Sequence, residues 1–372
     1  MLPGFGTISD TNWIVAKGKE LGFDLCGLAS VADLADPAHL NEWLARGFAG
    51  EMRYLHDPRR ADPARVLPGA RSVIVCALNY NQPQPYSTEA AAQAATDARA
   101  CGWISRYAWG DDYHVVLGKK LERLVSALRE RFGSDFTARA YVDTGPVAER
   151  AAAKLAGLGW LGKNTCLINE DLGSWLFLGI IVTSLELAER ATDRTPAPDL
   201  CGNCSLCLDA CPTGALVEPY VMDARHCISY LTIELRGSVP EELRARMGRQ
   251  VFGCDICQDV CPWNQAAAPR ASRAFQPREG LLAPELVWLL SLTAEEFRER
   301  FRASPVKRTK WRGLIRNACI AAGNALAKTG SASKGEEMQR LRDRLTQLAE
   351  SDDAVIAEHA RWALSRHADA KG

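Results

Sequence analysis

Eight of the thirteen cysteines of this chain are gathered between residues 201 and 261. Residues 201–212 read CGNCSLCLDACP, a C-x2-C-x2-C-x3-C-P pattern, and residues 254–262 read CDICQDVCP, the same pattern without its first cysteine. Cys227 can supply the missing ligand. Three closely spaced thiolates wrap one [4Fe–4S] cubane, while the cysteine before proline is held apart by the turn and reaches the other cubane. The spacing therefore predicts two [4Fe–4S] clusters.

The same pattern predicts which cysteines share a cluster. The first set is Cys201, Cys204, Cys207 and Cys261, and the second set is Cys211, Cys227, Cys254 and Cys257. Zinc is the alternative, but zinc ribbons use isolated cysteine pairs, not three cysteines in seven residues followed by Cys-Pro. We assign no chemistry to the remaining cysteines, which lie singly in apolar or alanine-rich segments where a thiol behaves as a small hydrophobe: Cys26, Cys76, Cys101, Cys166 and Cys319.

Two motifs on the N-terminal side of the cysteines partly match known cofactor-binding signatures. The stretch GLGWLG at 157–162 matches G-x-G-x-x-G, but a helical segment precedes it where a dinucleotide site needs a strand. We therefore expect these glycines to end a helix, with Lys163 and Asn164 just beyond. Asp112, His114 and Gly118 nearly match the D-x-H-x-x-G of corrinoid proteins, but the glycine is one residue late. His114 is therefore not expected to ligate cobalt.

The candidate acid of the first half is Asp143 in YVDTGPVAER, residues 141–150, which ends a predicted strand and enters a predicted helix. One interpretation makes Asp143 or Thr144 the N-cap of that helix, with Pro146 near its first position. The other makes Asp143 a buried carboxyl whose raised pKa suits a general acid. The residues alone leave both interpretations open.

The elements that must position these residues change character along the chain. From residue 1 to about 190, apolar runs typical of strands (24–29, 72–78, 137–142 and 176–183) alternate with helical patterns, which predicts an α/β fold with a mixed sheet. The alanine-rich segment 83–101 is expected to be a surface excursion, and TDRTPAPDL a linker into the cysteine block. After residue 277 apolar residues at three and four spacing predict helices, as a helical repeat or a plain hairpin.

The charge balance and the distribution of apolar residues indicate where the protein is located and what it does not bind. Lysine plus arginine and aspartate plus glutamate both count 45, so no global field indicates nucleic acid or a membrane. The N-terminus lacks a signal sequence and no apolar run could span a membrane, so we expect a cytoplasmic protein without a membrane partner.

Taken together, these motifs resemble the epoxyqueuosine reductase family, cobalamin-dependent enzymes that act on tRNA. The resemblance runs nearly end to end through LPGARSVIVCALNY, SRYAWGDDYH, YVDTGPVAERAAAKLAGLGWLGKNTCLIN, GSWLFLG, CISYLTIELRG and GLIRNACIAAGNAL. It implies a cobalamin-binding domain over 1–190, a ferredoxin-like 2[4Fe–4S] domain over 191–275 and a HEAT-like tRNA-binding domain over 276–372.

The resemblance also implies chemistry and roles. A base-off cobalamin, reduced to cob(I)alamin by the clusters, would remove the epoxide oxygen of epoxyqueuosine at the wobble position, with Asp143 as proton donor. The expected cobalamin contacts are Asp255, Cys254, Thr232, Glu234, Lys163, Arg60 and Tyr107. The expected tRNA contacts are Glu149, Arg150, Lys307, Arg308, Lys310, Arg312 and Arg316, although a solvated basic helix edge is the alternative for the last five.

Two other functions remain possible from the sequence. One is a corrinoid reductase of a small molecule, similar to reductive dehalogenases, which normally begin with a twin-arginine signal that is absent here. The other is a ferredoxin-like electron carrier. The expected partners are tRNA and an unidentified low-potential electron donor, and the chain is expected to be a monomer.

Overall fold

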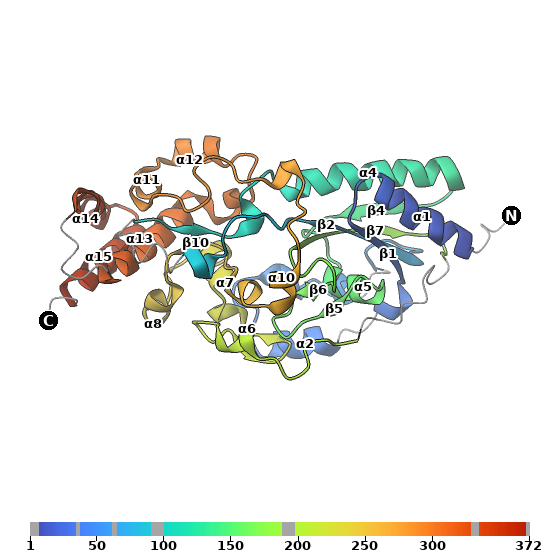
Figure 1. Cartoon of the computed structure of the whole chain (residues 1–372), viewed down its shortest axis with the longest axis horizontal. Helices are drawn as coiled ribbons and strands as arrows, with labels where there is room; N and C mark the ends of the chain where they lie inside the picture. Colours follow the sequence, from blue (N-terminus) through green and yellow to red (C-terminus); the bar gives the residue numbers. More distant parts are fainter. Residues whose placement is uncertain are drawn as a thin grey trace.

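The computed structural model describes residues 7–34, 38–61, 65–90, 100–187, 198–328 and 335–369. The molecule is elongated, with α1 (Ile8–Glu20) near one end and α15 (Ala354–Asp369) near the other (Figure 1). Among the described residues, no helix is long and apolar enough to cross a membrane. Nearly half of the predicted 83–101 excursion and most of the predicted linker fall on residues 91–99 and 188–197, outside the described residues.

A four-stranded sheet organises the first half, in the order β1-β2-β7-β4. Its strands are β1 (Leu25–Ser30), β2 (Ser72–Asn79), β7 (Leu176–Thr183) and β4 (Ala138–Tyr141). Every neighbouring pair is antiparallel, so the mixed sheet expected from the sequence is wrong for this sheet. Apolar periodicity predicts that a strand exists, but it carries no information on the direction of its partner.

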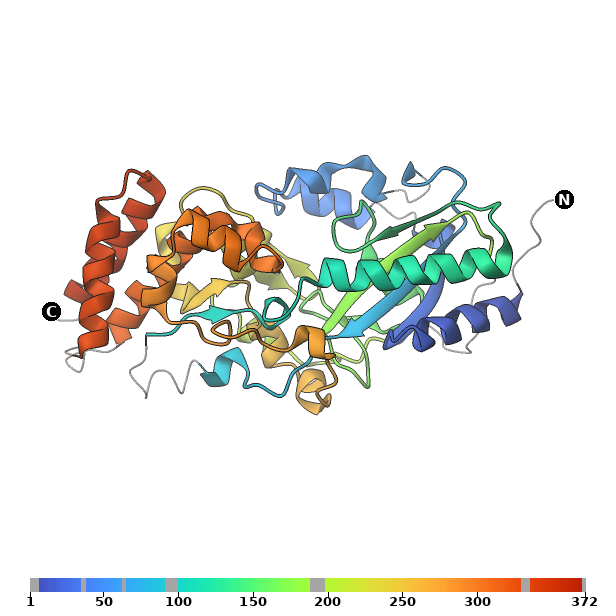
Figure 2. The same ribbon diagram turned by 90° about the horizontal axis from the view of Figure 1, so that it is seen from above.

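The central strand β2 is buried on both faces, which fits its unbroken apolar sequence. Because side chains alternate along a strand, Val73 and Val75 enter the core beneath α5 (Glu149–Leu155), whereas Ile74 and Cys76 enter the core with α4 (Tyr113–Phe132). Figures 1 and 2 show α4 and α1 covering one face of the sheet, and α5 lies against the other face. The result is a three-layer α/β/α arrangement.

Short elements build the cysteine block, as expected for a segment that lacks a large apolar core. They are α6 (Leu206–Asp209), β8 (Leu216–Glu218), β9 (Val221–Met222), α7 (Ile228–Ile233), α8 (Glu241–Arg244), β10 (Gln250–Phe252), α9 (Ile256–Asp259) and α10 (Pro262–Ala266). Strand β10 pairs in parallel with β3 (Trp103–Ile104) of the first half. The segment of α2 (Ala38–Ala45) also contacts the block, where the Trp43 indole donates to the Met222 carbonyl at 2.7 Å.

The C-terminal region is helical, as predicted. It consists of α11 (Leu286–Ser291), α12 (Ala294–Arg300), α13 (Lys310–Lys328), α14 (Glu336–Ala349) and α15. Helix α13 lies at its centre and contacts α7, β10 and each of the other four helices. At Gly323 a Cβ atom would lie 2.7 Å from the Ala363 Cα, so glycine permits the close approach of α13 and α15. This region therefore packs directly on the cysteine block through α13.

Candidate active site

The spacing assigns the eight cysteines to two sets of four, and the electrostatic neighbours of three of these thiols show which cysteines lie near one another. Burial raises the pKa of the Cys207 thiol to about 11, and Cys261, Cys201 and Cys204 act on it electrostatically. In the second set, Cys227 and Cys211 act on Cys254, and Cys166, Cys254, Cys227 and Cys211 act on Cys257, so Cys166 also lies near these thiols. Four thiolates are the donor set that a cubane requires, but among the described residues no three such side chains converge closely enough to hold a single metal ion. The two ligand sets therefore stay predictions.

The two groups differ in depth. Cys204 of the first group is exposed to solvent. In the second group none of the four thiols is exposed, although Cys261 of the first group is the most deeply buried of the eight. We call the first group the outer set and the second the inner set.

Buried polar side chains fix the loop that carries the inner set. Asp255 is 1% exposed, and its carboxylate accepts hydrogen bonds from the Ser105 hydroxyl, the Arg106 N–H at 2.8 Å and the Trp103 indole at 3.2 Å. The Thr232 hydroxyl donates to the Ile228 carbonyl at 2.7 Å and accepts the Gly253 N–H at 2.9 Å. Both side chains were expected to contact a cofactor; their polar atoms are instead used to position the loop.

Gly253 explains why this loop can approach the first half so closely. Its φ is +69°, and a Cβ atom there would lie 2.5 Å from the Ser105 Cβ. The ring of Tyr107 is 5.8 Å from that of Phe252 and 6.1 Å from that of Tyr113. Tyr107 therefore lies between the inner set and the region of Asp143.

Lys163 was also expected to contact a cofactor, but its ammonium donates to the carbonyls of Gly202 at 2.6 Å and Cys204 at 2.9 Å. It therefore fixes the loop of the outer set. Gly157, with φ +74°, ends α5, and β5 (Trp160–Leu161) follows and pairs with β6 (Leu167–Ile168). This is the helix-ending role expected for the glycines of GLGWLG.

Asp143 lies on the turn after β4 with φ +59°, a left-handed conformation that aspartate tolerates better than most residues. Its carboxylate accepts the Tyr113 hydroxyl at 2.8 Å and lies 3.7 Å from the His114 Nε2. Ala148, not Asp143 or Thr144, is the N-cap of α5, so the capping interpretation is wrong. Asp143 is free to face the groups around it.

The charge state of Asp143 differs from the expected one. Its side chain is 54% exposed, and although burial raises the pKa, the nearby His114 and the hydrogen bond from Tyr113 outweigh that effect and hold the pKa below its ordinary value. The predicted raised pKa is therefore wrong for this structure. The raised value belongs to Glu149, where burial and the Asp143 charge raise the pKa to about 8.

Glu149 supports the Asp143 turn, and Arg150 supports the turn between β5 and β6. The Glu149 carboxyl accepts the Asp143 N–H at 2.7 Å, and the Arg150 guanidinium donates to the Thr165 carbonyl at 2.5 Å. These contacts do not exclude the expected tRNA contact, because Arg150 is exposed.

A charged chain crosses from the C-terminal region to Asp143. Lys307, on η9 (Pro305–Thr309), donates to Asp112 Oδ2 at 2.6 Å, and Asp112 Oδ1 is 2.7 Å from His114 Nδ1. Burial lowers the pKa of His114, but the hydrogen bond with Asp112 and the nearby Asp143 carboxylate outweigh it and raise the pKa to about 9. His114 is therefore charged at neutral pH and pairs with both aspartates.

The remaining expected cofactor contacts line the same region. The Arg60 guanidinium lies 5.5 Å and the Arg308 guanidinium 5.7 Å from the centroid of the Tyr54 ring. Arg308 also forms an ion pair with Glu234 at 2.5 Å. Arg308 and Asp143 both act electrostatically on Tyr54 and on Tyr107, so these side chains lie near one another. Aromatic faces, charged groups and nearby thiols suit a large polar macrocycle such as a corrin.

The basic cluster expected to bind tRNA is divided by the fold. Arg316 is 1% exposed and donates to the carbonyls of Leu231, Leu235 and Gly237, so it joins α13 to α7 and cannot contact a phosphate. The side chains of Lys307 and Arg312 are about half-exposed, at 52% and 47%, each in an ion pair with an aspartate.

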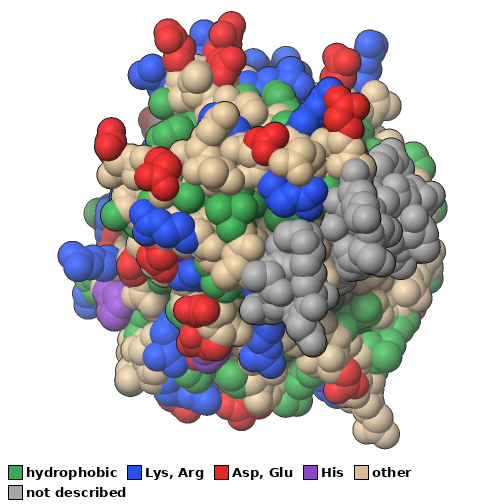
Figure 3. Space-filling view, turned by 90° about the vertical axis from the view of Figure 1, so that its left-hand side faces the viewer, with side chains coloured by type: hydrophobic (Ala, Val, Ile, Leu, Met, Phe, Trp, Pro, Cys, Tyr) green, Lys and Arg blue, Asp and Glu red, His purple; other side chains and the backbone are tan. Residues whose placement is uncertain are grey.

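Lys310 is exposed and Arg308 partly exposed. Figure 3 looks onto the C-terminal end of the molecule, where the coloured part of the face mixes Lys and Arg with Asp and Glu. That end is therefore not a continuous basic surface.

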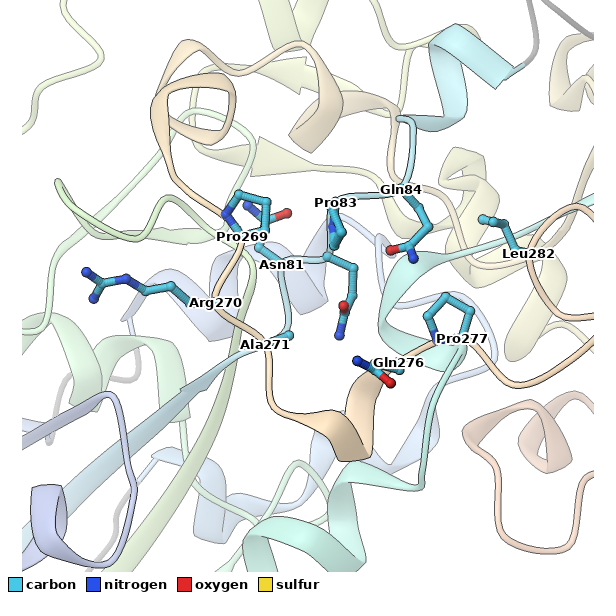
Figure 4. Close-up of a pocket in the computed structure, with 10 residues that line it drawn as sticks. Asn81, Pro83, Gln84, Pro269, Arg270, Ala271, Gln276, Pro277 and Leu282 are labelled. Carbon is cyan, nitrogen blue, oxygen red and sulfur yellow. The ribbon is translucent and has the colours of Figure 1, made fainter.

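A cavity of about 850 Å³ lies elsewhere, between the loop after β2 and the segment after α10 (Figure 4). Asn81, Gln82, Gln84, Arg270 and Gln276 contribute to its lining, and it includes none of the expected site residues. It is therefore separate from the region of Asp143.

Sequence reasoning missed several residues around Asp143. Tyr113 and Tyr54 were given no role, and His114 was considered only as a cobalt ligand. The SRYAWGDDYH motif carries a signal for two of them, because it places Asp112, Tyr113 and His114 together at the start of α4, whereas no motif marks Tyr54.

Two family models match the chain. The model described as epoxyqueuosine reductase QueG, DUF1730, matches residues 60–144, and the 4Fe-4S double cluster binding domain matches residues 200–264. The second match supports two [4Fe–4S] clusters.

Curated relatives match nearly the whole chain. The epoxyqueuosine reductase of Pseudomonas aeruginosa is 42% identical over 95% of this chain and 93% of that protein. The epoxyqueuosine reductase of Gloeobacter violaceus is 47% identical over 83% of this chain and 95% of that protein.

Solved structures agree with these relatives. An epoxyqueuosine reductase bound to an epoxyqueuosine-modified tRNA-Tyr stem loop is 29% identical, with a TM-score of 0.82 over 97% of this chain and 91% of that one. The enzyme from Bacillus subtilis, with its catalytic aspartate loop swung out of the active site, is 25% identical, with a TM-score of 0.77 over 97% of this chain and 100% of that one. The chain belongs to the epoxyqueuosine reductase family.

Proposed function

We propose that this chain reduces epoxyqueuosine in tRNA to queuosine, using cobalamin and electrons delivered through two [4Fe–4S] clusters. The observation that carries the proposal is that the Tyr107 ring contacts Phe252, beside the loop that carries Cys254, and also contacts Tyr113, which donates to Asp143. The small-molecule reductase and electron-carrier alternatives are not favoured, because the relatives that span the chain are epoxyqueuosine reductases.

Cobalamin would occupy the space between the sheet and the cysteine block, where it would supply a reduced cobalt nucleophile for the epoxide carbon. Arg60, Tyr54, Tyr107 and the Arg308–Glu234 pair offer charged and aromatic groups to its edge. Asp255 and Thr232 would act indirectly, by fixing the Gly253–Cys254 backbone. Lys163 would fix the backbone at Cys204, a proposed ligand of the outer cluster.

The cysteine groups suggest a direction for electron transfer. The outer set, Cys201, Cys204, Cys207 and Cys261, includes an exposed thiol where a protein donor can approach. The inner set, Cys211, Cys227, Cys254 and Cys257, is the one beside Tyr107 and the proposed corrin space. Electrons would therefore enter at the outer cluster and leave from the inner one.

Asp143 would protonate the departing oxygen. Its position on a turn, outside the helix, gives it freedom to approach a substrate, which agrees with the swung-out aspartate loop of the Bacillus subtilis enzyme. Glu149 holds the turn through the Asp143 N–H.

The tRNA would be held by the anticodon loop, since single-stranded loops expose the base that must enter the site. Arg150, Lys307, Arg308, Lys310 and Arg312 remain the proposed phosphate contacts, with Arg316 removed from the set. The proposed domains are residues 1–190, which would bind cobalamin, residues 191–275, which would carry the clusters, and residues 276–372, whose HEAT-like helices would bind tRNA. The protein is proposed to be a monomer in the cytoplasm.

Complementation tests the function. The gene would be expressed in a bacterial strain that lacks its own epoxyqueuosine reductase and grows with cobalamin. The proposal predicts that queuosine replaces epoxyqueuosine in the digested tRNA. Persistent epoxyqueuosine despite soluble, iron-replete protein would refute it.

A further inference from the structure

The reaction needs more protons than Asp143 can hold. Converting an epoxide to an alkene and water breaks two C–O bonds, forms one C=C bond and two O–H bonds, and consumes two electrons and two protons. The proposed clusters supply the electrons. One carboxyl group carries one proton, and the lowered pKa of Asp143 means that the resting carboxylate holds none at neutral pH. A second group must therefore store protons beside it.

His114 is the group that the fold places there. We propose that His114 is the proton store of the active site, held by the Lys307–Asp112 ion pair and passing its Nε2 proton to Asp143. This proposal rests on the proposed function. Neither His114 nor Asp112 appears among the expected catalytic residues, and His114 acts through Asp143, so we classify it as a positioning residue.

The geometry gives the transfer a direction. Asp112 Oδ1 lies 2.7 Å from Nδ1, so that nitrogen is occupied on the side away from Asp143. Nε2 lies 3.7 Å from Asp143 Oδ2 and, among the described residues, is a buried polar atom without a hydrogen-bond partner. A small movement of the Asp143 turn would close that gap. Stacking on Tyr113, with ring centroids 4.1 Å apart, fixes the imidazole plane.

The surrounding charges favour the protonated imidazole. Asp112, from the start of α4, and Asp143, from the turn after β4, are both negative, and together they raise the His114 pKa to about 9. Lys307, from η9, faces Asp112 at 2.6 Å and holds the pKa of that carboxyl low. Arg308 acts on Asp143 and further favours its ionised form.

The cycle then balances. The His114 imidazolium passes a proton to Asp143, and Asp143 gives it to the oxygen as the first C–O bond breaks. His114 regains its proton through Asp143, whose side chain is 54% exposed to solvent, because the His114 Nε2 itself is buried. A second transfer along the same path completes the water molecule.

Asp112→Asn tests the proposal, because asparagine caps helices about as well as aspartate does but removes the charge that favours the imidazolium. Asp111→Asn is the matched control: Asp111 is the adjacent residue, with a 56% exposed side chain paired with Arg278. Single-turnover rates with saturating epoxyqueuosine stem loop would be measured from pH 6 to 10, and His114 titrated by NMR in the cluster-loaded protein.

In the wild type we expect the rate to fall as pH rises through about 9, with His114 titrating there. Asp112→Asn should move both midpoints down by about 1 to 3 pH units, and Asp111→Asn should move neither. His114→Gln should slow turnover by about 10-fold or more and remove this limb.

An unshifted alkaline limb in Asp112→Asn, or an ordinary His114 titration in the wild type, would overturn the proposal. If the wild type forms no queuosine while His114 titrates as expected, the proposed function fails instead.

Discussion

Replacing Asp143 with asparagine should abolish proton transfer while leaving the site intact. Asparagine has nearly the same shape, tolerates the φ of +59° and can still accept the Tyr113 hydroxyl that Asp143 accepts at 2.8 Å. It cannot carry the transferred proton. A positioned general acid contributes about 10² to 10⁴-fold, which corresponds to about 3 to 5 kcal/mol of barrier.

The assay is a single turnover of cluster- and cobalamin-loaded protein with an epoxyqueuosine stem loop, followed by nucleoside chromatography. Asp135→Asn, on the exposed segment before β4, is the matched control and should react at the wild-type rate. Binding of cobalamin, followed by its absorption spectrum, should be the same in all three proteins. A wild-type rate in Asp143→Asn would show that the acid is another group.

Three further predictions follow from the structure. Cys204→Ser removes a ligand of the outer set and should reduce bound iron from about eight to about four atoms per chain. The control Cys166→Ser should keep about eight iron atoms. Equal losses of iron in both variants would contradict the assignment of ligands. Arg316→Met leaves three carbonyls without their donor, so the unfolding free energy measured in a urea titration should fall by about 3 kcal/mol or more. The control Arg312→Met lies on the same helix, but Arg312 is 47% exposed, so the loss should be under about 1 kcal/mol. The folded-state pKa of His114 is raised to about 9, so its contribution to the unfolding free energy should be full below pH ~6.5 and lost as pH rises through 9. That contribution is at most about 3 kcal/mol. A constant difference in unfolding free energy between wild type and His114→Gln across this pH range would contradict the prediction.

The sequence was sufficient where contacts are local or the chemistry dictates spacing. The cysteine spacing predicted the double-cluster domain that the family model matches, and unbroken apolar runs predicted β2 and β7 within a residue of their ends. Helix α13 was also recognisable from its periodicity.

Other features depend on distant partners. Lys307 reaches Asp112 across 195 positions, so no local pattern reports the charge environment of His114 and Asp143. Periodicity places Arg312 and Arg316 on one side of α13 but does not say which of them another element covers. Burial against α7 made Arg316 structural, and the antiparallel sheet likewise depended on pairing that periodicity does not encode.

The most direct test of the account is conversion of a defined substrate by purified protein. Protein reconstituted with iron, sulfide and cobalamin under anaerobic conditions would receive a low-potential reductant and a stem loop carrying epoxyqueuosine, and the digested nucleosides would be analysed by mass spectrometry. The account predicts a product lighter by one oxygen atom that co-elutes with queuosine. Unchanged epoxyqueuosine, with both clusters and cobalamin present, would contradict it.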